Sequence, residues 1–442
     1  MTNLKNQDPK IFKAISSEAK RQFEGLELIP SENYVSEAVL DAMGSILTNK
    51  YSEGFAGHRY YGGNAHIDVI EQEAIDRAKS LFGVEHVNVQ PYSGSPANFA
   101  VYHALLEPGD KVSGMNLLDG GHLTHGWKVS ATAKYFESHP YHVLHEGIVD
   151  YDELEKIAKE HKPKLIWCGA TAYPRVIEWE KFAKIADSIG AYLVADISHI
   201  SGLVAAGVHP SPVPYVHLIT TTTHKTLRGP RGAMIMVTKK GMEKDPELAG
   251  KIDKAIFPGL QGGPHNHTTA AIAVALKEAA STEFKSYAEQ IVKNTKALEA
   301  EFEKAGINMV SGGSDNHLLL LDLSKNGSLG SQLEYAMDLA HMTANKNTIP
   351  GEPSSPYYPS GLRLGTPALT TRGFKEADMV HVAGWIVRVI NHLKDDGLPS
   401  EQSERAGFIK AFKTKADQDP FLKSIGEEIK AYTKDFPIPG IK

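Results

Sequence analysis

The sequence predicts an α/β protein with a mainly parallel sheet, followed by a smaller α+β domain. Between about residues 69 and 237, stretches with helical spacing alternate with short apolar runs. Strands that are apolar throughout are typical of a parallel sheet whose two faces are both covered by helices. After Gly306 the pattern changes to strand, helix, a short irregular section and a final helix. This change indicates a second, smaller domain.

The elements follow from these patterns in chain order. Residues 8–24 carry apolar side chains at helical spacing and end at Gly25, a residue that commonly terminates helices. The next predicted helices are 69–82, 97–106, 152–160 and 179–189, and the predicted strands are 86–89, 111–115, 165–168, 191–195, 218–221 and 233–237. Helical periodicity over 268–305 predicts a long linking helix, and the last part contains strands 308–310 and 318–322 and helix 376–393. We therefore expect an N-terminal helical arm (1–50), a large domain (51–268), a linking helix region (269–306) and a small domain (307–442).

Composition excludes several classes of protein. The 442 residues are 41% hydrophobic and 23% charged, as in ordinary globular proteins. A net charge of -6 gives no basic footprint for nucleic acid or a membrane surface. No apolar run approaches the roughly 18 residues that a membrane-spanning helix needs, and residues 1–25 lack the apolar core of a signal peptide. Cys168 is the only cysteine, so we expect no internal disulfide and a cytoplasmic location.

Polar residues follow directly after the apolar run 191–195. Asp196 comes directly after the run, and His199 lies three residues further on. A carboxylate at the end of a buried strand is costly unless a cation or hydrogen-bond donors face it. Two interpretations are open: Asp196 caps a following helix, or it pairs with the protonated ring nitrogen of a pyridine cofactor.

A lysine occupies the equivalent position after the next predicted strand. Four threonines, residues 220–223, lead into His224 and Lys225, and Arg231 follows in a glycine- and proline-containing turn. Most lysines are solvated surface residues. A lysine between a strand end and such a turn, close to another cation that lowers the pKa of its amine, also suits Schiff-base chemistry.

A Ser-Gly-Ser turn at residues 93–95 lies between a predicted strand and a predicted helix. Small residues with hydroxyls and free amides at a helix N-terminus form an anion cradle, although the same turn is also an ordinary cap. The turn, the strand-end Asp196 and the strand-end Lys225 would together supply the three contacts that pyridoxal phosphate needs: a phosphate cradle, a partner for the pyridine nitrogen and an amine for the aldehyde.

Other polar segments suggest substrate handling. Ser31 follows an apolar segment near the first helix, and Arg363 lies in a strand-like stretch of the small domain. An arginine is the natural clamp for a substrate carboxylate, whereas a surface salt bridge is the plainer interpretation. His122 and His125 have a spacing compatible with a metal pair, but the sequence offers no third ligand near them, so we expect no metal. An imidazole that stacks on a ring fits better.

Several long motifs of the sequence resemble those of a known family. From about residue 26 to about residue 388 the sequence is similar to serine hydroxymethyltransferases, in long motifs at residues 28–35, 48–54, 59–63, 120–126, 220–232, 257–264 and 345–347. The resemblance implies the aspartate-aminotransferase-like fold of pyridoxal phosphate enzymes (fold type I), with a mostly parallel seven-stranded sheet and active sites built between two subunits of a homodimer, or of a tetramer. It implies reversible transfer of the hydroxymethyl group of serine to tetrahydrofolate, which gives glycine and 5,10-methylenetetrahydrofolate.

The resemblance also implies roles for single residues at the cofactor. Lys225 would carry the cofactor, Asp196 would pair with its pyridine nitrogen, His122 would stack on its ring and His199 would contact its phenolic oxygen. The other residues implied at the cofactor are Ser93, Gly94, Ser95, Thr171 and His224, with Tyr51, Gly262 and Gly263 from the partner subunit.

For the substrates, the resemblance implies that Ser31 and Arg363 hold the amino-acid carboxylate. Tyr51, Glu53, Tyr60 and Tyr61 would enter from the other subunit, with Glu53 as proton shuttle and Tyr61 assisting the exchange of lysine for substrate. The residues implied at the folate are Leu117, Gly121, Tyr60 and Asn347. Three positions depart from the usual pattern: Ser198 would change the environment of the cofactor ring, Pro30 would stiffen the loop beside Ser31, and residues 351–358 leave the preferred folate form open.

Two alternatives to this interpretation remain. One is an aldolase of the same fold that cleaves β-hydroxy amino acids without folate; the segments around Asn347 and Glu53 favour the folate-dependent enzyme instead. The other is a non-catalytic descendant that acts as a binding protein. Such a protein would be expected to have lost the lysine, the aspartate or the arginine, and all three are present.

Overall fold

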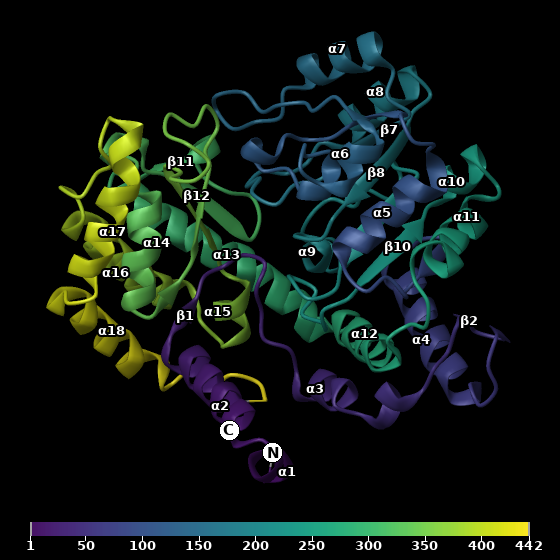
Figure 1. Cartoon of the computed structure of the whole chain (residues 1–442), viewed down its shortest axis with the longest axis horizontal. Coiled ribbons are helices and arrows are strands. Elements are labelled where there is room, and N and C mark those ends of the chain that lie inside the picture. The colour runs from purple at the N-terminus through teal and green to yellow at the C-terminus, as the bar shows by residue number, and fades with distance from the viewer. Residues whose placement is uncertain (1, 441–442) are drawn as a thin grey trace. The chain divides into compact units, whose positions relative to one another are not determined.

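The structure is a computed structural model that describes residues 2–440 (Figure 1). The chain groups into two compact units. The large unit contains Val35–Gln290 and Asp315–His317, and the small unit contains the residues up to Tyr34, Ile291–Ser314 and the residues from Leu318 onward. The four-part division predicted from the sequence stays a prediction.

A seven-stranded sheet forms the centre of the large unit. Its strand order is β4 (His86–Asn88), β10 (Ala233–Val237), β9 (Leu218–Thr222), β8 (Tyr192–Asp196), β7 (Leu165–Cys168), β5 (Lys111–Ser113) and β6 (Glu137–Ser138). Only β10 is antiparallel to its neighbours; the other pairs in the sheet are parallel. The predicted mostly parallel seven-stranded sheet is therefore confirmed.

The register of β8 and β9 places the site. Asp196 at the end of β8 lies beside Thr220 of β9, so the residues after both strands emerge at the same edge of the sheet. The core strands β7, β9 and β10 are buried along their whole length, which explains their unbroken apolar or threonine-rich sequences. Polar side chains that follow these strands are the ones available for a ligand at the carboxyl edge.

Helices cover both faces of this sheet, as Figure 1 shows. The helices of the large unit are α3 (Glu37–Met43), α4 (Ala65–Phe82), α5 (Gly94–Leu105), α6 (Ala131–Tyr135), α7 (Tyr151–His161), α8 (Trp179–Ser188), α9 (Ser201–Ala205), α10 (Lys239–Lys244), α11 (Leu248–Lys254) and α12 (Asn266–Ala279). Two short strands, β2 (Gly54–Phe55) and β3 (His58–Arg59), pair on their own. Helix α5 begins at Gly94, three residues before its predicted start, so Ser93 takes the N-cap position.

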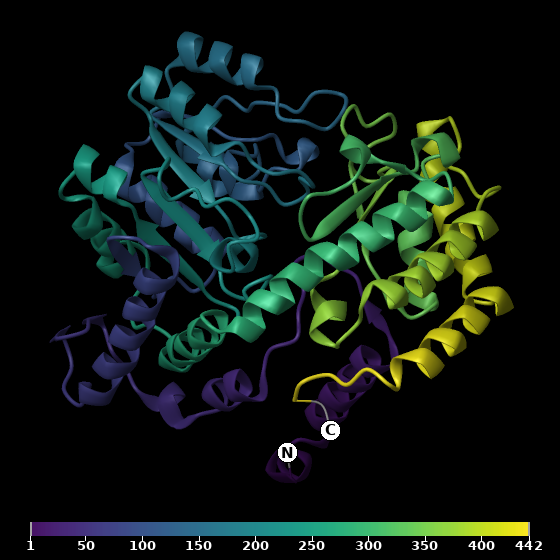
Figure 2. The ribbon, with the colours of Figure 1, turned by 180° about the vertical axis from the view of Figure 1, so that it is seen from behind.

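The long helix predicted within residues 268–305 is α13 (Thr282–Lys304), which begins in the large unit and ends in the small unit (Figure 2). It is separated from α12 at Ala280 and Ser281. The hydroxyl of Ser281 accepts a hydrogen bond from the amide of Phe284 at 3.1 Å and so satisfies one N–H group of the first turn of α13.

The small unit is an α+β arrangement. Its antiparallel sheet has the order β11 (Asn308–Met309), β12 (Leu318–Asp322), β15 (Gly361–Gly365) and β14 (Asn345–Asn347). A second, two-stranded pair joins β1 (Leu26–Glu27) to β13 (Met342–Thr343). The helices are α1 (Thr2–Gln7), α2 (Pro9–Glu24), α14 (Gly330–Leu339), α15 (Pro367–Thr371), α16 (Glu376–His392), α17 (Arg405–Ala416) and α18 (Pro420–Thr433).

Arg372 fastens both ends of the chain within the small unit. Its guanidinium donates to the carbonyls of Phe23 at 2.9 Å and Gly25 at 2.7 Å, and also to those of Thr433 at 3.1 Å and Phe436 at 2.9 Å. A buried guanidinium needs several acceptors to offset the loss of water, and backbone carbonyls at segment ends provide them. The C-terminal ends of α2 and α18, with the residues just after them, are thus held together.

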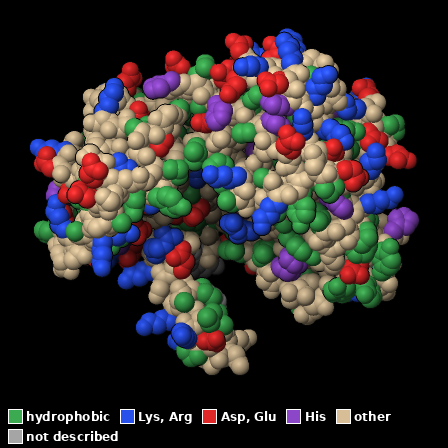
Figure 3. All heavy atoms as spheres, turned by 45° about the horizontal axis from the view of Figure 1, so that its top comes forward, with side chains coloured by type: hydrophobic (Ala, Val, Ile, Leu, Met, Phe, Trp, Pro, Cys, Tyr) green, Lys and Arg blue, Asp and Glu red, His purple; other side chains and the backbone are tan. Residues whose placement is uncertain are grey.

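On the visible face in Figure 3, lysine and arginine side chains alternate with aspartate and glutamate, as expected for a chain of modest net charge. Within residues 2–440, no helix combines the length and the apolar character needed to cross a membrane.

Candidate active site

Asp196 is held at the sheet edge by three hydrogen-bond donors. Its Oδ2 accepts from Nδ2 of Asn98 at 2.9 Å and from Nε2 of His125 at 3.2 Å, and its Oδ1 accepts from the amide of Ser198 at 3.0 Å. The Ser198 bond makes a local turn after β8. Asn98 and His125 come from α5 and from the loop after β5, so the carboxylate is more than a local cap.

The surroundings keep this carboxylate ionised. Burial by itself would raise the pKa of Asp196, but the hydrogen bond and charge of His125, followed by the neighbouring His122 and Lys225, hold that pKa well below its ordinary value. Asp196 is therefore an anion at any physiological pH, in a place from which water is largely excluded. It can stabilise a cationic ligand group placed next to it.

His125 was considered in the sequence only as one half of a metal pair. In the structure its ring stacks on Trp167, with centroids 5.1 Å apart and planes 11° apart, and its Nδ1 accepts from the amide of His122 at 3.4 Å. The motif Gly-His-Leu-Thr-His contained the signal, but the partner of His125 lies 71 residues away and only the fold reveals it. Asn98 was missed for the same reason.

His122, Asp196 and His125 place their ligand-type atoms within 4.8 Å of one another. The sequence argument that the histidines lack a third ligand was therefore wrong, because the fold supplies Asp196. Nε2 of His125 and Oδ2 of Asp196 already bind each other, however, and Nδ1 of His122 accepts from the amide of Thr124 at 3.2 Å. The expectation of no metal stays a prediction.

His122 has the properties of a neutral stacking ring. Burial lowers the pKa of His122 to about 4, and the neighbouring His125 and Lys225 contribute to the same shift. Its ring is thus uncharged at neutral pH.

Lys225 follows β9 and is 9% exposed. The neighbouring His224 is also buried. Burial lowers the pKa of His224 to about 3, with the charges of Lys225 and Arg231 adding to the shift. A neutral His224 keeps one N–H group to donate to an anion.

The Ser93–Ser95 turn lies against the end of β9. A Cβ atom built on Gly94 would come within 2.8 Å of Cγ2 of Thr222, so the backbone of the turn approaches the strand as closely as only glycine allows. Ser93, Gly94 and Ser95 open α5, a helix of 12 residues, and the side chain of Ser93 makes no capping hydrogen bond. The N-terminus of α5 therefore lies beside the end of β9, the strand that leads to His224 and Lys225.

Thr171 and the folate candidates Leu117 and Gly121 belong to one loop system. The hydroxyl of Thr171 lies 3.1 Å from the carbonyl oxygens of both Gly120 and Gly121, and its amide donates to Gly120 at 2.7 Å. Leu117 begins a 3₁₀ turn just before these glycines. The loop that carries His122 is thus tied to the segment after β7.

A second group of candidate residues surrounds Tyr51. Its hydroxyl donates to Oε1 of Glu53 at 3.0 Å, and its ring packs edge-on against Tyr61 with centroids 5.3 Å apart. Cβ positions built on Gly262 and Gly263 would lie 3.1 Å from Oε1 of Glu53 and 3.2 Å from the Tyr51 ring. This group also contains Tyr60, which packs on Phe257.

The carboxylate-clamp candidates lie in the small unit. Arg363, on β15, donates from Nε to Oδ1 of Asn345 at 3.0 Å, and burial lowers the pKa of Arg363 to about 10, which leaves it charged at neutral pH. Pro30 packs directly on Gly365 of the same strand. Ser31 is the next residue in the chain after Pro30. The folate candidate Asn347 lies on β14, next to β15, and donates to the carbonyl of Thr348 at 2.7 Å.

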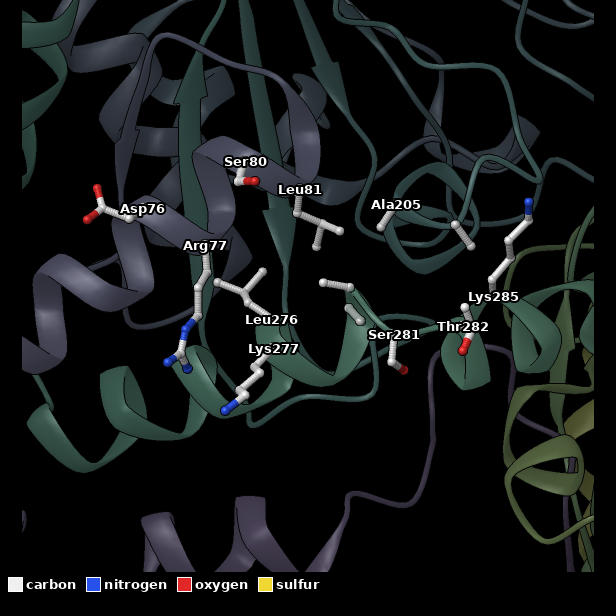
Figure 4. A pocket seen from close by; sticks show the side chains of 13 residues that line it. Asp76, Arg77, Ser80, Leu81, Ala205, Leu276, Lys277, Ser281, Thr282 and Lys285 are labelled. Carbon is white, nitrogen blue, oxygen red and sulfur yellow. The ribbon is translucent and has the colours of Figure 1, made fainter.

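A cavity of about 630 Å³ lies apart from all these residues (Figure 4). It is formed by the ends of α4 and α12 and the start of α13. Arg77, which lines it, is already bound to the carbonyl of Ala273 at 2.7 Å and to Glu73 at 2.6 Å. None of the residues predicted at the cofactor or the substrates lines it.

The mainly parallel seven-stranded sheet, with a buried aspartate and a buried lysine at its carboxyl edge, agrees with the arrangement expected of fold type I of the pyridoxal phosphate enzymes. Comparisons with known proteins narrow this class. The family model described as serine hydroxymethyltransferase matches residues 4–386. The chain therefore belongs to the serine hydroxymethyltransferase family.

Curated relatives agree with the family match. The serine hydroxymethyltransferase of Desulfotalea psychrophila is 51% identical over 442 residues, which cover 100% of this chain and 97% of the relative. That of Acidothermus cellulolyticus is 52% identical over 438 residues, 98% of this chain and 96% of the relative. That of Francisella tularensis subsp. mediasiatica is 53% identical over 403 residues, 91% of this chain and 95% of the relative.

Proposed function

We propose that this enzyme binds pyridoxal 5'-phosphate and transfers the hydroxymethyl group of serine to tetrahydrofolate, which yields glycine and 5,10-methylenetetrahydrofolate. The observation that carries the proposal is the buried, ionised Asp196 within the electrostatic reach of Lys225 at the carboxyl edge of the sheet. When bound, the cofactor supplies an electron-withdrawing protonated pyridine ring.

The residues present fit this cofactor. Nδ1 of His224 and Oγ1 of Thr222 are buried without a hydrogen-bond partner among residues 2–440, which is costly unless a ligand meets them. Both belong to the segment that carries Lys225, and Thr222 adjoins the Ser93–Ser95 turn. A phosphate held by the N-terminus of α5, Ser93, Ser95 and His224 would satisfy such groups.

At the other end of the ring, Asp196 would hold the proton on the pyridine nitrogen. Asn98, His125 and the Ser198 amide fix both carboxylate oxygens, so the charge is oriented before a ligand arrives. Neutral His122 would stack on the ring face, and Lys225 would bind the aldehyde carbon and exchange with the substrate amine. Thr171 would support the ring from the segment after β7.

Arg363 and Ser31 would bind the carboxylate of serine, and a charged guanidinium is suited to that role. Glu53 would hold or release the proton of the serine hydroxyl. Leu117, Gly121, Tyr60 and Asn347 would line the folate subsite.

The second group of residues supports a homodimer with shared sites. Tyr60 is 74% exposed, and Tyr51 and Tyr61 are also exposed despite their size. Aromatic side chains gathered on a surface are typical of subunit interfaces. We propose that Tyr51, Glu53, Tyr60, Tyr61, Gly262 and Gly263 complete the site of a partner subunit. Cys168, the single cysteine, is buried, which fits the proposal of a reducing cytoplasmic location.

The test of the proposed activity is glycine formation from serine with and without tetrahydrofolate. We expect rapid glycine formation that depends on tetrahydrofolate, measured with purified protein loaded with pyridoxal phosphate. Equal rates of serine cleavage in the absence of the folate would contradict the proposal and favour the folate-independent aldolase.

Gly94→Ala is expected to weaken the binding of pyridoxal phosphate by roughly 10-fold or more, because the added methyl group overlaps Cγ2 of Thr222 and pushes the turn away from its place. Absorbance titration of cofactor-free protein measures this affinity. Gly250→Ala is the matched control: it lies on α11 in open space and should leave the affinity unchanged. An unchanged affinity of Gly94→Ala would rule out the Ser93–Ser95 turn as the phosphate site.

A further inference from the structure

Two buried imidazoles face each other in the large unit. Nδ1 of His199 and Nε2 of His317 are 3.2 Å apart, and the rings are tilted by 37° with centroids 5.4 Å apart. His317 is 0% exposed and His199 is 5% exposed. No role for His317 follows from the motifs discussed above.

His317 is rigidly anchored. It ends the three-residue segment Asp315–His317, which lies in the large unit although the chain on either side belongs to the small unit. The amide of Asp315 donates to the carbonyl of Pro174 at 2.8 Å, and its Oδ1 binds Nη1 of Arg175 at 2.9 Å. Asn316 donates to the carbonyl of Tyr173 at 3.0 Å. Asp315 and Asn316 thus fasten the segment to the loop after β7, directly before His317.

His199 is anchored on the cofactor side. Its carbonyl accepts a hydrogen bond at 2.9 Å from the hydroxyl of Thr226, the residue next to Lys225. His199 also follows Asp196 by three residues. The backbone of His199 is therefore fixed relative to Asp196 and Lys225, the two residues that we propose to hold the cofactor. The orientation and protonation of the His199 ring depend on the contacts of the ring itself.

A hydrogen bond between two ring nitrogens couples the tautomers of the two rings. At 3.2 Å one nitrogen donates its hydrogen and the other accepts it through its lone pair. If Nδ1 of His199 accepts, a neutral His199 must carry its hydrogen on Nε2, and it can then donate through Nε2 to an acceptor oxygen. If Nδ1 donates, Nε2 bears a lone pair and repels such an oxygen.

We propose that His317 is a positioning residue: it donates from Nε2 to Nδ1 of His199, and so makes Nε2 of His199 a hydrogen-bond donor for the phenolic oxygen of the cofactor. This inference rests on the proposed function, because Nε2 of His199 needs to be a donor only if the bound cofactor places an acceptor oxygen beside it. The arrangement parallels metal-binding histidines, whose second nitrogen is oriented by a hydrogen bond behind the ring.

The test compares two replacements in the full-length protein. His317→Phe keeps a ring of similar volume without nitrogen, and we expect it to weaken pyridoxal phosphate binding roughly 10- to 100-fold and to shift the absorbance band of the bound cofactor. His317→Gln restores an N–H donor and should recover both properties to within about 3-fold of the unchanged protein. His209→Phe is the control, since His209 is also buried and its Nδ1 binds the carbonyl of Pro210 away from the site.

Equal losses in His317→Phe and His209→Phe, or failure of His317→Gln to recover the affinity and the absorbance band, would overturn the proposal. A second measurement does not depend on the cofactor. Nitrogen NMR of protein labelled in histidine, before pyridoxal phosphate is added, should show His199 with its hydrogen on Nε2. A hydrogen on Nδ1 would refute the proposed tautomer. If the unchanged protein does not bind pyridoxal phosphate at all, the proposed function fails instead, and the NMR result still decides the tautomer.

Discussion

Lys225→Ala is expected to abolish steady-state conversion of serine to glycine. The variant loses the amine that would bind the cofactor aldehyde and exchange with the amino group of serine, and with it a nearby base for proton transfer. The lost proton transfer alone corresponds to roughly 10²- to 10⁴-fold in rate. Because Lys225 lies in the buried edge of the sheet, other surface amines cannot replace it. Glycine formation over many turnovers is the measurement.

The control for this variant is Lys277→Ala, which removes an exposed lysine from the rim of the separate cavity in Figure 4. It should retain the full rate. Steady-state turnover of Lys225→Ala close to that of the control would show that the enzyme does not use this lysine.

Asp196→Asn is the second substitution expected to have a large effect. The amide has nearly the same shape, but both carboxylate oxygens of Asp196 accept hydrogen bonds, so the new NH₂ group must face either the Ser198 amide or the Asn98 and His125 donors. The negative charge opposite the pyridine nitrogen is lost as well. We expect kcat to fall by roughly 10²- to 10³-fold, the usual magnitude for one electrostatic contact in the transition state, together with weaker cofactor binding.

The pH dependence of this group has a clear sign. The folded-state pKa of Asp196 lies below the ordinary value for an aspartate. The contribution of Asp196 to stability is therefore present above that ordinary value and is lost only as the pH falls through the folded-state pKa.

Asp187→Asn provides the matched control for the rate of Asp196→Asn, because Asp187 pairs with Lys240 on the surface and its charge should be of little consequence. Rates of Asp196→Asn and Asp187→Asn that agree would contradict the role of Asp196.

The strands that the sequence predicted best are those with unbroken burial. The bounds of β7, β10 and β12 agree with their predicted runs, because β7 and β10 are apolar from end to end and β12 is apolar up to its last residue, Asp322. Strand β6 was not predicted as an element, since Glu137 and Ser138 are polar and short and they pair only because β5 lies beside them. Helices α17 and α18 were also not predicted.

The residues of the candidate site also fall into those that the sequence revealed and those that it did not. Asp196 and Lys225 could be found because each follows a predicted strand, and parallel strands bring their carboxyl ends together. The residues that orient them could not be found: Asn98 and His125 lie 98 and 71 positions from Asp196, and His317 lies 118 positions from His199. Only the folded chain brings these side chains into contact.

We propose above all that Lys225 and Asp196 hold one aromatic aldehyde between them. Borohydride reduction of the protein with pyridoxal phosphate makes the bond between the aldehyde carbon and its lysine permanent, and peptide mass spectrometry then locates it. We expect the added mass on the peptide that contains Lys225, at a level greatly reduced in Asp196→Asn. Attachment to a different lysine in the unchanged protein, or no attachment, would contradict the proposal.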